Sequence, residues 1–92
     1  MRQTGVTFRA VLRALTLASE GKYVVYECSS HNMAKWTFVK ALATSEPFVK
    51  QQEDRVLKLR IGEGSVRFSR RLLDRELDEV RSARGCVLIQ DF

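Results

Sequence analysis

Residues 57–69 read LKLRIGEGSVRFS. Apolar and polar, mostly basic, side chains alternate on both sides of the central Gly-Glu-Gly, which is the pattern of two antiparallel strands joined by a tight turn. Because successive side chains of a strand point to opposite faces, the pattern predicts a β-hairpin with one apolar and one basic face. We expect Lys58, Arg60 and Arg67 to lie on the exposed face. The inward face is predicted to carry Leu57, Leu59, Ile61, Val66 and Phe68.

The residues before the hairpin predict a helix, a strand and a second helix. Apolar side chains recur every three or four positions over residues 7–19, which is typical of a helix with one buried stripe. The run 22–28 is largely β-branched and aromatic, and it predicts a strand covered on both faces. A second helix is expected to end at Pro47, with Trp36 and Val39 facing the core. The stripe of the first helix is Phe8, Val11, Leu12, Leu15 and Ala18, and the possible N-caps of the second are Ser29, Ser30 and Asn32.

After the hairpin we expect a short surface helix and another apolar strand. Leu73, Leu77 and Val80 recur at helical spacing in a charged background, whereas residues 86–89 read CVLI and predict a buried strand. The two apolar strands are most simply parallel neighbours. We therefore expect residues 1–92 to form one small α/β domain of two or three layers, with parallel strands and a β-hairpin. Its open sheet edges predict a homo-oligomer.

Positive charge is concentrated around the hairpin. Residues 55–75 hold seven basic and two acidic side chains, a net charge of +5, and the whole chain also carries +5, so the remaining residues sum to zero. A charge confined to one segment is typical of a protein whose partner is a polyanion, and nucleic acid is the first candidate. The alternatives are a solvated surface or an acidic protein partner.

The candidate binding residues are mainly basic side chains on and after the hairpin. The sequence has no helix-turn-helix or zinc-finger pattern, and a flat basic sheet suits a flexible backbone, so we expect single-stranded rather than duplex nucleic acid. DNA and RNA both remain open. Aromatic side chains have faces that stack on unpaired bases, but we expect most of them to lie in the core. The predicted nucleic-acid contacts are Lys58, Arg60, Arg67, Arg70, Arg71, Arg75, Arg2 and Lys35.

Other kinds of site find little support in the sequence. His31 is the only histidine, and Cys28 and Cys86 have no paired spacing, so we expect neither a metal site nor a cofactor. Both cysteines are expected to be reduced, buried thiols. No apolar run approaches the roughly 20 residues of a membrane span, and no secretion signal is recognisable, so we expect a cytoplasmic protein with no membrane contact.

Four segments carry a resemblance to a known family. Gln3–Thr7 is similar to the end of a phosphate-binding loop, and Gly21–Tyr26 is similar to the strand after the first helix. Gly64–Phe68 resembles a Gly-Ser-x-Ile-x-Phe hairpin, and Arg84–Asp91 resembles a strand that ends in a magnesium-binding acidic pair. The family is that of RecA-like P-loop ATPases, especially the motor domains of phage terminases and helicases. The resemblance implies half of a P-loop core and a phage-encoded protein acting in the host cytoplasm.

The chain departs from that family at the positions that perform catalysis. Val6 stands where the phosphate-binding lysine is required, and Phe92 stands where the catalytic carboxylate is required. Without them nothing is arranged to stabilise the charge of a transition state, so we expect a remnant fold without ATPase activity. Backbone amides at the start of the first helix, helped by Arg2, suit a nucleic-acid phosphate. A helix capped by Thr4 or by Thr7 is the simpler interpretation.

These observations predict a non-enzymatic protein that binds single-stranded DNA and assists or recruits an RNA polymerase or the replication machinery. The competing hypothesis is a protein-interaction factor that binds an acidic surface of a host polymerase or motor subunit. Salt dependence separates the two, because phosphate binding weakens steeply with salt on every nucleic-acid sequence. A third hypothesis, a regulatory nucleotide binder, requires saturable ATP binding despite Val6.

Overall fold

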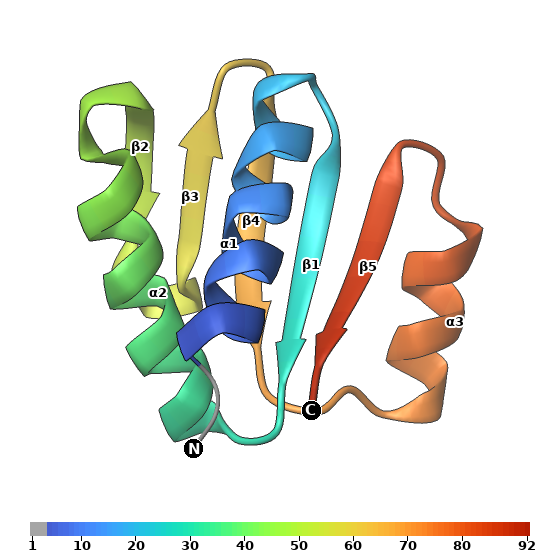
Figure 1. Cartoon of the computed structure of the whole chain (residues 1–92). Helices are drawn as coiled ribbons and strands as arrows, with labels where there is room; N and C mark the ends of the chain where they lie inside the picture. Colours follow the sequence, from blue (N-terminus) through green and yellow to red (C-terminus); the bar gives the residue numbers. More distant parts are fainter. Residues whose placement is uncertain (1–3) are drawn as a thin grey trace.

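The structure, a computed structural model, describes the backbone of residues 4–92 and the side chains from Phe8 onward. Along the chain a helix and a strand are followed by a second helix, three consecutive strands, a third helix and a last strand (Figure 1). The helices are α1 (Thr4–Ser19), α2 (His31–Ser45) and α3 (Asp74–Ser82), and two short 3-10 turns cover Glu46–Phe48 and Asp54–Val56. The strands are β1 (Tyr23–Cys28), β2 (Val49–Glu53), β3 (Lys58–Ile61), β4 (Gly64–Ser69) and β5 (Cys86–Asp91).

The five strands form one mixed sheet in the order β2-β3-β4-β1-β5. β1 runs parallel to both of its neighbours, β4 and β5, while β3 runs antiparallel to both of its neighbours, β2 and β4. The α/β class, the hairpin and the parallel pairing of the two apolar strands are thus confirmed. β2 and the pairing of β4 with β1 were not predicted.

The hairpin turn packs closely against the end of α1 because two of its positions require glycine. Gly62 has a φ of 58°, a left-handed conformation that side chains other than glycine rarely adopt. At Gly64 an added Cβ would collide with the carbonyl oxygens of Lys22 and Ala18. These two glycines therefore allow the start of β4 to lie directly against the end of α1.

Helices α1 and α2 cover one face of the sheet, and α3 lies beside the edge strand β5 (Figure 1). The core between helices and sheet centres on three aromatic rings. Phe68 of β4 lies 5.2 Å from the ring of Tyr26 and 6.1 Å from the ring of Phe38, measured between centroids. Leu59, Ile61 and Val66 complete the sheet side of this core, as the alternation in the hairpin predicted.

The predicted inner faces of α1 and α2 were partly wrong. In α1 the prediction holds for three positions, but Phe8 and Leu12 are exposed. In α2, Trp36 is 45% exposed and Val39 is 60% exposed, so neither faces the core. In α2, Ala34 and Ala41 let the helix approach a sheet that already carries large side chains, and Phe38 packs against Phe68 of that sheet. The buried residues of α2 are Ala34, Thr37, Phe38, Ala41 and Ser45.

The N-cap of α2 is one of the three predicted residues. Ser30 Oγ accepts a hydrogen bond from Met33 N at 3.2 Å, which satisfies one of the free amides at the helix start. Both cysteines are free thiols; Cys28 is buried, but Cys86 is only half-buried, which corrects the prediction of a fully covered last strand. Within the described residues, no helix combines the length and apolarity needed to cross a bilayer.

The raised pKa values of two side chains in β1 lead us to expect that the fold loses stability at alkaline pH. Burial raises the pKa of the Cys28 thiol from 9.0 to about 11. Burial, together with the hydrogen bond that Tyr26 Oη donates to Asp91 Oδ2 at 2.8 Å, raises the pKa of Tyr26 far above its ordinary value of 10.0. Both groups stay protonated in the fold at pH values where the unfolded chain ionises. Their stabilising contribution is therefore complete below about pH 9 and is lost as the pH rises.

We expect the urea midpoint of unfolding to be lower at about pH 10.5 than at about pH 8. The double variant Cys28→Ala/Tyr26→Phe should lose less stability over the same interval, because neither group then ionises. Circular dichroism at both pH values measures the midpoints. Equal pH dependence in the wild type and the double variant would show that these groups do not control the alkaline transition.

Candidate nucleic-acid interface

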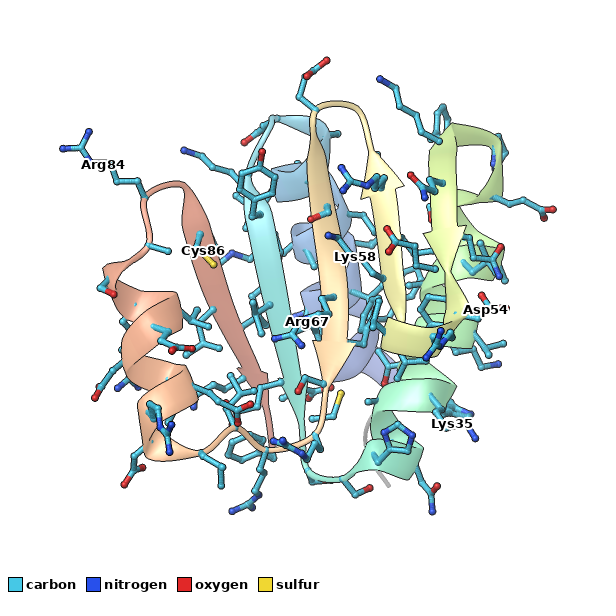
Figure 2. All side chains as sticks on the ribbon, turned by 180° about the vertical axis from the view of Figure 1, so that it is seen from behind. Lys35, Asp54, Lys58, Arg67, Arg84 and Cys86 are labelled. Carbon is cyan, nitrogen blue, oxygen red and sulfur yellow. The ribbon has the colours of Figure 1, made fainter. Side chains whose placement is uncertain are left out.

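The sheet face turned away from α1 and α2, here called the open face, carries three of the predicted basic residues, Lys58, Arg60 and Arg67. The strand register places its side chains in rows across the sheet. One row is Glu53, Lys58, Arg67, Val25 and Leu88. The next row is Gln51, Arg60, Ser65, Tyr23 and Cys86. In Figure 2, Lys58 and Arg67 project over the middle of this face.

Lys58 and Arg67 are directly opposite each other on the antiparallel strands β3 and β4. Side chains in such positions have Cβ atoms about 5 Å apart, and like charges there are destabilising. Neither side chain forms an ion pair with a residue that the structure describes. The fold therefore holds two positive charges together on an open surface, which is a suitable arrangement for an anion.

Arg60 lies in the adjacent row and is partly neutralised. Its Nε atom is 3.6 Å from Glu53 Oε2, and its side chain is 47% exposed. Exposed ion pairs of this kind contribute about 1 kcal/mol or less. Glu53 is also the residue opposite Lys58 on β2, but its carboxylate contacts Arg60. The pairing was missed at the sequence level because β2 was not predicted.

Arg70 and Arg71 lie in the segment between β4 and α3, and both have local partners. Arg70 Nη1 is 3.2 Å from Glu76 Oε1. The hydrogen bond from Leu73 N, followed by that from Arg70, lowers the pKa of Glu76. The Arg71 guanidinium lies 4.4 Å from the ring centroid of Phe92. These arginines are thus held in place rather than free.

The buried carboxylate of Glu27 positions this segment. Glu27 is 2% exposed, and its oxygens accept hydrogen bonds from Leu72 N at 2.7 Å and from Gln90 Nε2 at 2.9 Å. Glu27 pairs in register with Ser69 and Gln90 on the open face, at the carboxyl ends of the parallel strands. The Arg70–Leu73 segment therefore passes that end of the face. A carboxylate inside an apolar strand was the available signal, and sequence reasoning missed it.

The remaining predicted residues do not join the group. Arg75 is exposed on α3, beside the sheet edge. Lys35 is exposed on α2, which covers the opposite face of the sheet, so the structure separates it from Lys58 and Arg67 (Figure 2). Arg2 lies outside the described residues. The structure thus gathers Lys58, Arg60 and Arg67, with Arg70 and Arg71 at one end.

Tyr23 belongs to the aromatic residues that were considered for base stacking and were mostly expected in the core, and the structure places it on the open face. It opens β1, is 52% exposed, and lies in register between Ser65 and Cys86. Arg67 is its diagonal neighbour on β4, two positions beyond Ser65. An exposed aromatic ring next to basic side chains combines a stacking surface for a base with contacts for phosphates. The sequence placed Tyr23 in an apolar run and thereby concealed its exposure.

The positions that resemble an ATPase site lie on the helical face of the sheet, at the carboxyl ends of the parallel strands. Gly5 and Val6 belong to the first turn of α1, and Asp91 ends β5, where it accepts the hydrogen bond from Tyr26. This contact gives Asp91 a structural role in the fold. No protein-family model, curated protein or solved structure matches this chain.

Proposed function

We propose that the protein binds single-stranded nucleic acid without catalysing a reaction, and that the open face of its sheet is the binding surface. The observation that carries this proposal is the cross-strand pair Lys58 and Arg67, two cations held side by side that form no ion pair with any side chain from Phe8 onward. Phosphate groups would relieve their repulsion. Arg60 would join them when its weak contact with Glu53 opens.

Single-stranded nucleic acid suits this surface better than duplex. The middle of the open face is formed by the strands themselves, and no helix projects from it to enter a groove (Figure 2). A flexible strand can place phosphates on Lys58 and Arg67 while an unstacked base lies on Tyr23. Recruitment of a polymerase or a replication factor is the wider role that we propose for such a complex.

Fluorescence anisotropy with labelled single-stranded and duplex oligonucleotides of one sequence tests this proposal. We expect tighter binding to the single strand. With about three phosphate contacts, affinity should fall by roughly an order of magnitude between about 50 and 200 mM salt. Absence of binding at the lower salt, or binding that salt does not weaken, would contradict the proposal. Either result would favour the alternative of an acidic protein surface as the partner.

Replacing Tyr23 by alanine should weaken single-strand binding about tenfold, since stacking of one base is worth about 1 to 3 kcal/mol. Tyr23→Phe keeps the ring and should retain the wild-type affinity. An oligonucleotide with abasic sites offers phosphates without bases, so on this probe all three proteins should bind alike. If Tyr23→Ala binds the normal oligonucleotide as the wild type does, bases do not stack on this residue.

A further inference from the structure

The outer surface of the helical layer is unusually apolar. Phe8 and Leu12 of α1 are exposed, as are Trp36 and Val39 of α2 and Phe48 just after it, with exposed fractions between 39% and 72%. Single exposed apolar side chains are common, but several large ones on one layer of a small domain indicate an interaction surface. This surface is opposite to the open face and is independent of the proposed nucleic-acid site.

The charged side chains within the two helices that form this surface are all basic. α1 carries Arg9 and Arg13, α2 carries Lys35 and Lys40, and neither helix contains an aspartate or a glutamate. Glu20 and Glu46 follow the ends of the two helices. The Lys40 ammonium group lies 5.4 Å from the ring centroid of Trp36, so a cation borders the largest exposed ring. Four cations without a carboxylate on either helix favour an anionic partner.

The surface is also hollowed. A groove of about 470 Å³ is lined by Leu12 and Leu15 of α1 and by Thr44 of α2, and it continues to Phe48 and Ile61. Its lining is mainly apolar, and it is open to solvent between the carboxyl-terminal halves of the two helices. A concave apolar groove of this size accepts protruding leucine or aromatic side chains.

We propose that an acidic amphipathic helix of a protein partner docks between α1 and α2. Its apolar side chains enter the groove beside Leu12 and Phe48, and its carboxylates face Arg9, Arg13 and Lys40. α1 has 16 residues, so a partner helix that spans the layer is about 24 Å long. The protein would then hold nucleic acid on one face and a protein helix on the other.

Two other occupants fit the observations less well. A second copy of this chain, docked through the same surface, would bring Arg9, Arg13 and Lys40 against equal charges. An anionic membrane would satisfy the charges, but membrane surfaces take up protruding apolar side chains and leave a concave groove unfilled. Charge sign and shape together therefore favour an acidic helix.

Trp36 is the only tryptophan of the chain, and it reports on this surface directly. The probe is a synthetic helical peptide with leucines spaced three and four residues apart and glutamates elsewhere. We expect a saturable blue shift of the tryptophan emission, weakened by salt, because docking removes the ring from water. A companion peptide with lysine in place of every glutamate should give no shift.

Four results would overturn the proposal. They are the absence of a shift at millimolar glutamate peptide, an equal shift with the lysine peptide, a shift with vesicles of phosphatidylglycerol and phosphatidylcholine but not with the peptide, and a shift on raising the protein concentration alone. The last two would assign the surface to a membrane or to a second copy.

Charge-reversal variants on the two faces test where the glutamate peptide binds. Lys40→Glu should weaken binding of the glutamate peptide at least about fivefold while leaving oligonucleotide binding unchanged. Arg60→Glu is the matched control on the opposite face and should leave peptide binding unchanged. If both variants weaken peptide binding equally, net charge rather than the groove controls the interaction, and the proposal fails.

Discussion

Phe68→Ala is expected to destabilise the protein so strongly that the folded state is barely populated. The ring is 2% exposed and lies between Tyr26 and Phe38, where the sheet meets α2. Removing a buried phenyl ring costs about 3 to 5 kcal/mol. The whole stability of a domain is about 5 to 15 kcal/mol, and a chain of 92 residues belongs to the lower part of that range.

Urea unfolding followed by circular dichroism measures this loss. Phe48→Ala is the matched control, because Phe48 is 72% exposed and its removal leaves no cavity in the core. We expect the control to change the unfolding free energy by about 0.5 kcal/mol or less. Phe68→Leu should give an intermediate midpoint if Phe68→Ala does not fold. Equal midpoints for the two alanine variants would contradict the core described above.

The second large effect is expected on binding. Neutralising Lys58 and Arg67 together, as Lys58→Gln/Arg67→Gln, should reduce single-strand affinity on the order of a hundredfold at low salt, since each charged hydrogen bond is worth on the order of 1.5 kcal/mol. The slope of log affinity against log salt should also become shallower by about 1.4, because two phosphate contacts are lost. Fluorescence anisotropy gives both quantities.

The control for this variant removes the same charge from the other layer. Lys35→Gln/Lys40→Gln has an equal net charge, but Lys35 and Lys40 belong to α2. We expect its affinity for the oligonucleotide to stay within about twofold of the wild type. If the two double variants weaken binding equally, the protein attracts nucleic acid by net charge alone and the open face is not the site.

The hairpin could be predicted because one rule governs its whole length. Alternation of apolar and polar residues fixed both the strands and the face on which Lys58, Arg60 and Arg67 lie. β2 could not be found in the same way. Residues 49–53 read VKQQE, a mostly polar sequence, and as an edge strand β2 has only one neighbouring strand. The contact of Glu53 with Arg60 was hidden with it.

The buried side of α2 could not be predicted from the sequence, although the helix itself was. Apolar residues recur at helical spacing on more than one side of α2. The side with Trp36 and Val39 was expected in the core because a small domain needs its large apolar side chains there. The structure buries the side with Ala34, Phe38 and Ala41. The two alanines let the helix approach a sheet that already carries Tyr26, and Phe38 packs against Phe68 of that sheet. Such a choice depends on the volume available in three dimensions, which a single sequence does not reveal.

The same limit applied to the candidate site. Tyr23 and Glu27 stand in one apolar strand, yet one is exposed and the other is buried with two hydrogen bonds. Their difference depends on the Arg70–Leu73 segment, which is distant in sequence and passes only one end of the open face. Sequence spacing located the cations and could not locate their neighbours.

Heteronuclear NMR of the protein, titrated with an oligothymidylate of about 12 nucleotides, shows residue by residue whether the open face binds nucleic acid. We expect backbone amides of β1, β3 and β4 around Tyr23, Lys58 and Arg67 to change their chemical shifts, while those of Trp36 and Leu12 do not. Changes confined to α1 and α2, or no changes at all, would contradict the assignment of the open face to nucleic acid.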